Sequence, residues 1–296
     1  MKDIDIESYL LDQGKLIDEL MVSLVPSEDT HPRIIHEAMR YSLFSRSKKI
    51  RPVLALATAE ALDCDKETIA PFACALEMIH THSLIHDDLP SMDDDDYRRG
   101  KLSSHKIYGE GLAILAGNAL LVLAFETVSR AGGDPKRKLA ALNCLCRAIG
   151  TKYGLLGGQV MDLSLEGKSF TKEDLDYIHS SKTGALIETS VVGAAILSGA
   201  GEDETRRFGN YGKKVGLAFQ ITDDILDVTG SAEKLGKTTG KDEISRKATY
   251  PSLFGLEASR KKAGELVDEA VSELEWLGER GLVLAELAKF ISTRRF

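Results

Sequence analysis

The residues with the clearest chemical potential form a run of carboxylates between positions 87 and 96. Six aspartates occur within these ten positions, and Arg98 and Arg99 follow almost at once. Crowded carboxylates repel one another unless a cation neutralises them, and Mg²⁺ is commonly held by one or two carboxylates together with substrate phosphates. Arginine binds phosphate through a planar fork of donors. The run therefore predicts either a metal and phosphate site or a solvated acidic loop, which is what most charge runs are.

A second acidic pattern lies on an apolar helical segment in the second half of the chain. Asp223, Asp224 and Asp227 are spaced as Asp-Asp-x-x-Asp, and Lys237 and Lys247 follow in a basic loop. Asp223 and Asp227 share one helix face, where like charges destabilise the helix unless something compensates them. Two such half-sites in one helical protein indicate a shared cavity for several metal ions and a diphosphate.

Basic and histidine residues lie upstream of the first acidic run. Lys48 and Arg51 flank the start of a predicted helix at Pro52, where proline is favoured and backbone N–H groups attract anions. An ordinary basic loop is the alternative. His82 and His86 share a face of the predicted helix 67–87, so a His/Asp metal site as in HD-type phosphohydrolases is conceivable. Because the acids greatly outnumber the histidines, a role in lining a cavity is the better hypothesis for both.

Three polar residues interrupt apolar helical sequence in the middle of the chain. Gln159 and Asp162 are three positions apart and therefore share a face; buried polar pairs need partners, so they form either a structural network or part of a pocket. Lys182 has apolar neighbours that allow it to point into a pocket, although lysine is usually exposed.

The whole chain favours an all-α protein. It has 296 residues, 43% of them hydrophobic, and a net charge of −8, which is normal for a globular protein and argues against nucleic acid as a partner. No linker-like composition divides it, so we expect one domain over residues 1–296. Helical periodicity predicts helices over residues 4–23, 31–45, 51–61, 67–87, 110–130, 135–151, 154–164, 171–199, 203–228, 240–257 and 259–275, with one more near the C-terminus.

Cysteine usage and hydropathy predict a cytoplasmic protein. The four cysteines form no CxxC pair and are expected to be reduced core residues. The N-terminus lacks the basic and apolar segments of a signal peptide. The most apolar run, 112–128, falls short of a membrane span and is expected to be a buried central helix. A calcium loop that starts at Asp93 is excluded, because Arg98 stands where the turn glycine is needed and no glutamate occupies the twelfth place. A P-loop is excluded because no complete GxxxxGK[ST] pattern precedes a helix.

From Lys48 to Pro251 the chain resembles the trans-isoprenyl diphosphate synthases of the short-chain bacterial farnesyl and geranylgeranyl type. Residues 87–93 match the longer DDxxxxD form of the first aspartate-rich motif of that family, and residues 223–227 match the second, DDxxD. The resemblance implies three Mg²⁺ ions on an allylic diphosphate. The predicted metal-binding residues are Asp87, Asp88, Asp93, Asp223, Asp224 and Asp227.

The resemblance also assigns the substrate-binding residues. Those on isopentenyl diphosphate would be Lys48, Arg51, His80 and Arg99, and those on the allylic diphosphate Arg98, Lys182, Lys237 and Lys247. Thr183 and Gln220 match residues whose oxygens face the developing carbocation, and with Lys182 they form the predicted catalytic set. One departure is the sequence Arg46-Ser47 before Lys48, where the family often has two glycines.

The resemblance further implies the fold and the reaction. The fold is an all-α bundle of about ten or more helices around a deep central cavity, usually in a homodimer. The reaction is head-to-tail (1'-4) condensation by ionisation, condensation and elimination. His82 and Ser83 would form the floor that limits product length. Planar His82 favours farnesyl diphosphate, with geranylgeranyl diphosphate as the alternative. A terpene cyclase or a non-catalytic synthase subunit fits less well, because both acidic motifs are intact. The C-terminal Arg294-Arg295-Phe296 is expected to be a frayed end.

Overall fold

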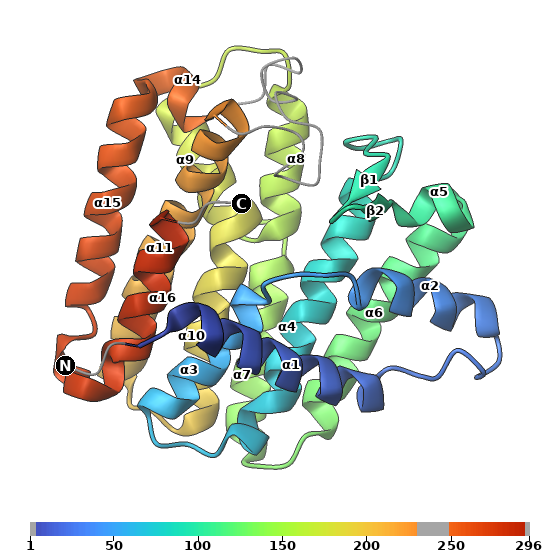
Figure 1. Cartoon of the computed structure of the whole chain (residues 1–296), viewed down its shortest axis with the longest axis horizontal. Coiled ribbons are helices and arrows are strands. Elements are labelled where there is room, and N and C mark those ends of the chain that lie inside the picture. The colour runs from blue at the N-terminus through green and yellow to red at the C-terminus, as the bar shows by residue number, and fades with distance from the viewer. Residues whose placement is uncertain (1–3, 230–248, 294–296) are drawn as a thin grey trace.

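The computed structural model describes residues 4–229 and 249–293, and it is a helical bundle (Figure 1). This confirms the all-α prediction. The helices are α1 (Ile6–Leu24), α2 (Arg33–Leu43), α3 (Ile50–Ala61), α4 (Lys66–Asp87), α5 (Ser104–Tyr108), α6 (Glu110–Arg130), α7 (Pro135–Ile149), α8 (Leu155–Leu165), α9 (Lys172–Ile178), the π-helix η1 (His179–Gly184), α10 (Ala185–Ser198), α11 (Glu202–Thr229), α14 (Tyr250–Phe254), α15 (Leu256–Ser272), the 3₁₀-helix η2 (Glu275–Gly281) and α16 (Leu282–Thr293). That the chain is one domain with a deep central cavity stays a prediction.

Helix starts follow the capping chemistry of the sequence. Asp5, Asp65 and Asp134 precede α1, α4 and α7, and each side chain accepts a hydrogen bond from a backbone N–H of the first turn. Such caps satisfy donors that have no partner inside the helix and typically contribute about 1 kcal/mol each. Local sequence therefore sets these boundaries before any packing is considered.

Three departures from the predicted helices are informative. The predicted helix 171–199 is divided into α9, η1 and α10 by the π-turn at His179–Gly184. The predicted helix 240–257 begins outside the described residues, and Gly255, with a φ of 80°, separates α14 from α15. A two-residue hairpin, β1 (Tyr97–Arg98) and β2 (Lys101–Leu102), and the short helix α5 were not predicted. They are too short to produce a periodic pattern.

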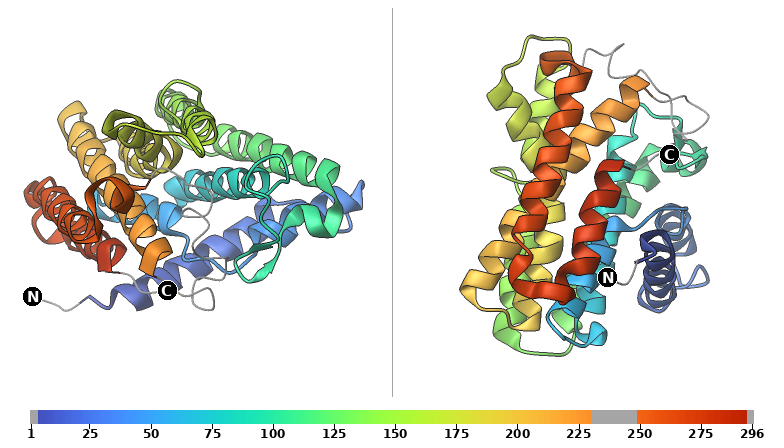
Figure 2. Two further views of the ribbon diagram at one scale, coloured as in Figure 1. Left: turned by 90° about the horizontal axis from the view of Figure 1, so that it is seen from above. Right: turned by 60° about the vertical axis from the view of Figure 1, so that its left-hand side comes forward.

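Helix α4 lies at the centre of the bundle. Seen from above, it is surrounded by the other helices (Figure 2), and every residue from Phe72 to Ile79 is buried. A helix that is apolar on all sides belongs in a core. It packs along α6, α3 and α10, while α11 packs against α10 and α15. The core thus fixes the positions of α4 and α11, whose C-terminal ends carry the two acidic motifs.

Helix α6 combines a buried and an exposed apolar face. It is long and apolar enough to cross a membrane by length and composition, yet it packs along α4 as a member of the bundle. Only 39% of its most apolar window is buried, so the prediction of a fully buried central helix was wrong for its outer face. Ile114, Leu115 and Val122 are exposed there.

Candidate active site

The first acidic motif lies where α4 ends. Asp87 is the last residue of the helix, and the loop folds back so that the N–H of Asp93 donates to the carbonyl of Asp87 at 2.9 Å. Burial raises the pKa of the Asp87 carboxyl to about 6; Lys182 opposes the shift and Asp93 adds to it. The fold therefore holds Asp87 in a partly desolvated position with a second carboxylate and an ammonium close by.

Asp88 has a different environment from Asp87. Its side chain is 2% exposed, and Oδ1 accepts a hydrogen bond from Nε of Arg98 at 2.8 Å and another from Nη2. Nη2 of Arg98 also donates to Asp95 at 3.0 Å. Arg98 thus neutralises the Asp88 carboxylate, and the role of Asp88 as a metal ligand stays a prediction. Arg98, predicted to bind the allylic diphosphate, compensates two buried carboxylates.

The second acidic motif lies near the C-terminal end of α11. Asp224 is 3% exposed, and its two oxygens accept hydrogen bonds from the Gln220 amide at 2.9 Å and the Tyr250 backbone N–H at 2.8 Å. Nε2 of His179 lies 3.2 Å from the same carboxylate. These contacts hold the Asp224 carboxylate in place, and its role as a metal ligand stays a prediction. Asp223 and Asp227 are one turn apart on α11 and therefore share a face of the helix.

The π-helix η1 carries Lys182 and Thr183 toward both motifs. Nζ of Lys182 lies 2.6 Å from Oδ2 of Asp162 on α8, and the Thr183 hydroxyl donates to Oε1 of Gln220 at 2.7 Å. π-turns are frequent at functional sites, and here one includes Lys182 within a helical segment. The sequence allowed Asp162 to belong either to a structural network or to a pocket. In the structure its carboxylate forms an ion pair with Lys182.

Close approach of α8 to η1 depends on Gly158. A Cβ atom at this position would clash with the backbone nitrogen of Lys182 and lie 2.7 Å from its Cα. Glycine lets the two backbones approach closely, and this brings Asp162 within reach of the lysine. Gln159, the next residue, is 5% exposed, and neither of its amide atoms has a hydrogen-bond partner among the described residues. A buried amide without partners suits a position that lines a site.

A basic cluster lies one to two turns below the end of α4. Arg99 donates from Nη1 to Oγ of Ser45 at 3.2 Å, and its Nη2 lies 3.6 Å from Glu77. Burial, and then the positive charges of Arg51 and Arg99, hold the pKa of His80 well below its usual range. A neutral histidine flanked by two guanidinium groups favours an anion such as a phosphate.

Aromatic rings connect this basic cluster to other helices. The Arg51 guanidinium lies 5.9 Å from the centroid of the Phe219 ring on α11, and Nζ of Lys48 lies 5.1 Å from that of Phe290 on α16. Phe219 directly precedes Gln220, so Arg51 is adjacent to the second acidic motif. The ends of α4 and α11 face the same end of the bundle, beside α14 and the hairpin (Figure 1).

Comparison with known sequences gives the family. The sequence model of the family described as polyprenyl synthetase matches residues 32–275. The chain belongs to the polyprenyl synthetase family. A geranylgeranyl diphosphate synthase of Cyanophora paradoxa is 46% identical over 294 residues, which cover 99% of this chain and 97% of that protein. The chloroplastic geranylgeranyl pyrophosphate synthase of Capsicum annuum is 50% identical over 285 residues, 95% of this chain and 75% of that protein.

A solved structure gives the same result for the fold. The crystal structure of geranylgeranyl pyrophosphate synthetase from Pyrococcus horikoshii has a TM-score of 0.88 and 32% sequence identity, and the match covers 98% of this chain and 99% of that one. This polyprenyl synthetase is therefore a prenyltransferase of the trans-isoprenyl diphosphate synthase type with the all-α fold of that group.

Several predicted site residues of this polyprenyl synthetase fall outside the described residues. Lys237 and Lys247 lie in the segment 230–248, and Arg294-Arg295-Phe296 form the C-terminal end. Their predicted positions thus stay predictions. The predicted floor residues are described: His82 is 5% exposed and packs on His86, with ring centroids 4.5 Å apart, while the Ser83 hydroxyl donates to the His80 carbonyl at 2.9 Å.

Sequence reasoning missed the residues that hold the site residues in place. Glu77 is 1% exposed and accepts a hydrogen bond from Ser47 at 3.2 Å while it faces Arg99. His179 faces Asp224. Glu77 and Arg99 are far apart in sequence, and so are His179 and Asp224. A lone buried histidine gives no sequence signal of its role, whereas a glutamate inside an apolar run is a visible anomaly.

Proposed function

We propose that this chain condenses isopentenyl diphosphate head to tail (1'-4) with dimethylallyl or geranyl diphosphate, and that its main product is geranylgeranyl diphosphate. The observation that carries the reaction is the approach of Asp87 and Lys182, which come from α4 and η1 and interact electrostatically. A carboxylate for metal binding and an ammonium for the leaving group are thereby available to one diphosphate.

Four carboxylates fit the predicted Mg²⁺ ions. We assign Asp87 and Asp93 to one side of the diphosphate and Asp223 and Asp227 to the other, and oxygen ligands of this kind are those that Mg²⁺ prefers. Burial and the nearby Asp93 carboxylate raise the pKa of Asp87. A bound cation would stabilise its ionised form. We propose three ions per site; bound there, Mg²⁺ would neutralise the charge of the diphosphate.

The protein side chains supply orientation and charge. Lys182, held by Asp162, donates to the diphosphate oxygen as the C–O bond of the allylic substrate breaks. Lys48, Arg51, His80 and Arg99 hold isopentenyl diphosphate, whose double bond attacks the cation before a proton is lost. Thr183 and Gln220 offer their oxygens to the cation, and exclusion of water prevents its capture. No nucleophile from the protein is required.

Two observations support a C20 rather than the C15 product that His82 alone suggested. The relatives described above carry the name geranylgeranyl diphosphate synthase. At about 100° per residue, Ser83 is offset from Asp87 by about 40° and His82 by about 140°. Ser83 thus lies more directly below the metal-binding end, and it is small. His82 is turned toward Gly117 of α6, where a Cβ would lie 3.3 Å from its Nδ1.

Product analysis tests this function. The pure protein is incubated with Mg²⁺, dimethylallyl diphosphate and excess labelled isopentenyl diphosphate, and the dephosphorylated products are sized. We expect mainly C20. A C15 product would retain the reaction and refute the product assignment. Absence of elongation by folded protein, with farnesyl diphosphate consumed on its own, would indicate a cyclase; activity only with a second chain would indicate a subunit.

We further propose that the chain is a cytoplasmic homodimer. The support is the exposed apolar face of α6, where Leu115 is 57% and Val122 65% exposed; contiguous exposed apolar surface usually marks an interface. A second copy related by two-fold symmetry could cover the same face on both partners. Light scattering of wild-type protein should give twice the chain mass, and Val122→Glu should shift it toward the monomer.

A further inference from the structure

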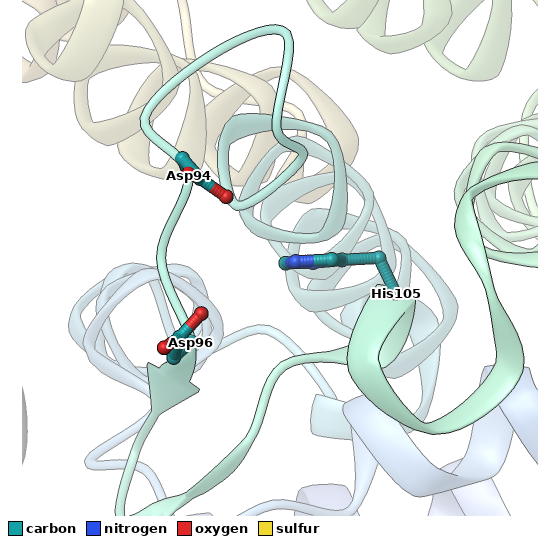
Figure 3. Close-up of side chains that lie close together, drawn as sticks. All are labelled: Asp94, Asp96 and His105. Atoms are coloured by element: carbon teal, nitrogen blue, oxygen red, sulfur yellow. The ribbon is translucent and has the colours of Figure 1, made fainter.

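Three potential metal ligands cluster outside both aspartate-rich motifs. Asp94, Asp96 and His105 each offer one ligand atom, and these atoms all lie within 4.8 Å of one another. The two aspartates belong to the segment that precedes β1, whereas the histidine belongs to α5. Figure 3 shows the three side chains pointing into a common space. The potential ligands of the segment before β1 and of α5 therefore lie close together in the fold.

His105 gives independent support for a ligand at this position. Its side chain is buried, with 7% exposed, and neither ring nitrogen has a hydrogen-bond partner among the described residues. Buried polar groups are nearly always paired, and a buried imidazole is among the commonest metal ligands. Its ring points toward the two carboxylates (Figure 3), so the unused hydrogen-bonding capacity faces the acidic side of the cluster.

We propose that Asp94, Asp96 and His105 bind one divalent transition-metal ion, with Zn²⁺ or Mn²⁺ as the chemical class, at a site distinct from the diphosphate site. One nitrogen and two carboxylate ligands match the preferences of these ions, whereas Mg²⁺ prefers oxygen ligands alone. Three protein ligands leave the remaining positions to water. The site requires no substrate, so its existence does not depend on the proposed reaction.

The geometry requires only small movements. Bonds of about 2.1 Å in a tetrahedral site place ligand atoms roughly 3.4 Å apart. The ligand atoms here all lie within 4.8 Å of one another, so the cluster must contract by at most about 1.4 Å. Asp94 and Asp96 are exposed, so their carboxylates lie on the solvent side of the cluster. Lys106 now pairs with Asp96 at 2.7 Å. A solvent-exposed ion pair contributes little, so a divalent ion can displace the ammonium.

An ion bound by this cluster would affect the loop that carries the first acidic motif. Asp94 directly follows Asp93, and Asp96 directly precedes the hairpin that carries Arg98 and Arg99. The carbonyl of Asp96 also accepts a hydrogen bond from the N–H of Ser103, the residue that precedes α5, at 2.9 Å. A bound ion would fasten this loop to α5 and so restrict the first acidic motif.

Metal titration of the purified full-length protein tests the proposal. Metal-free protein is titrated with Zn²⁺ by calorimetry, without any diphosphate and with millimolar Mg²⁺ present. We expect one Zn²⁺ per chain. Asp94→Ala removes an exposed ligand and should weaken binding at least about tenfold, since even outer-shell changes cost 10–100-fold. His105→Gln should abolish the binding. The double variant Asp223→Asn/Asp227→Asn is the matched control and should bind Zn²⁺ as the wild type does.

Each other outcome overturns the proposal. These outcomes are no binding by the wild type, unchanged binding in Asp94→Ala, or loss of binding in the control. Circular dichroism checks that each variant is folded; if His105→Gln is not, the exposed Asp94→Ala variant decides alone. Anomalous diffraction from a Zn²⁺-soaked crystal gives a second readout. A peak between the three side chains supports the site, and peaks confined to the diphosphate motifs refute it.

Discussion

The carboxylate of Asp224 accepts a hydrogen bond from the backbone N–H of Tyr250 at 2.8 Å, which ties the second acidic motif to helix α14. His179 and the Gln220 amide contact the same carboxylate. Adjacent aspartates of one motif therefore have different tasks. In the proposed site Asp223 faces the metals, while Asp224 joins α11, η1 and α14, which include the elements that carry Gln220, Lys182 and Thr183.

Substitution of these two neighbours should separate stability from activity. Asp224→Ala removes an acceptor from buried donors and should lower the free energy of unfolding by about 3 kcal/mol or more. Asp223→Ala should change it by less than about 1 kcal/mol but lower kcat by about a hundredfold or more. Urea unfolding and prenyl transfer assays measure the two effects. Equal stability of the two variants would contradict the assigned roles.

Asp87→Asn should stabilise the metal-free protein while it removes activity. The pKa of Asp87 is raised from 3.8 to about 6, so its ionised form is disfavoured in the fold. Its penalty is fully present above about pH 6, diminishes as the pH falls, and is absent below the unfolded value. Asparagine mimics the protonated acid. Thermal unfolding in chelator should show a higher Tm at pH 7.5 and no gain at pH 4; a lower Tm at pH 7.5 would contradict the expectation.

The sequence was sufficient for most of the fold and for the outline of the site. Apolar periodicity identified the long helices, and two acidic motifs on helical segments predicted that their ends meet. It was not sufficient to say which aspartates face the metals. Neighbouring residues of a helix point about 100° apart, so Asp223 and Asp224 cannot share a face. Which of them turns inward depends on α14 and η1, and these contacts are visible only in three dimensions.

The sequence also did not predict the π-turn that includes Lys182 or the cluster around His105. Residues 179–184 are mostly weak helix formers, but low helix propensity does not indicate that one turn contains an extra residue. His105 is a lone histidine in a five-residue helix. Its relation to Asp94 and Asp96 arises from the hairpin between Asp96 and His105, whose two-residue strands are too short for an alternating pattern.

Gly158→Ala should disturb the position of Lys182. The added methyl group would clash with backbone atoms of Lys182 that cannot move aside. Overpacking of this kind costs about 1–3 kcal/mol, and a shift of about 1 Å at a reacting group can lower the rate about a hundredfold. Urea unfolding and kcat measure both effects, which should appear together.

Gly14→Ala is the matched control for Gly158→Ala. Gly14 lies within α1, and nothing lies within 4 Å of a Cβ built there. Alanine in a helix interior is favoured over glycine by roughly 0.5–1 kcal/mol, so this variant should be slightly more stable and fully active. If Gly158→Ala behaved like this control, close contact between α8 and η1 would not be needed to place Lys182.

Ser83→Phe should shorten the product. Ser83 is buried and lies nearly below Asp87 on α4, so an aromatic ring there would occupy the space into which the growing chain extends. We expect the main product to change from C20 to C15, with kcat for the first condensation changed less than about tenfold, because a residue one turn below the metals does not touch the reacting atoms. Sizing of the dephosphorylated products measures the change.

His82→Ala distinguishes this floor from the alternative one. The His82 ring faces His86 and Gly117, and burial followed by the His86 charge lowers its pKa to about 4, so it is a neutral packing group at pH 7. Its removal should leave the C20 product unchanged while it destabilises the contact between α4 and α6. If His82→Ala gave a product longer than C20 and Ser83→Phe did not shorten the product, the floor would lie at His82. The growing chain would then extend toward α6 rather than along the Asp87 face of α4.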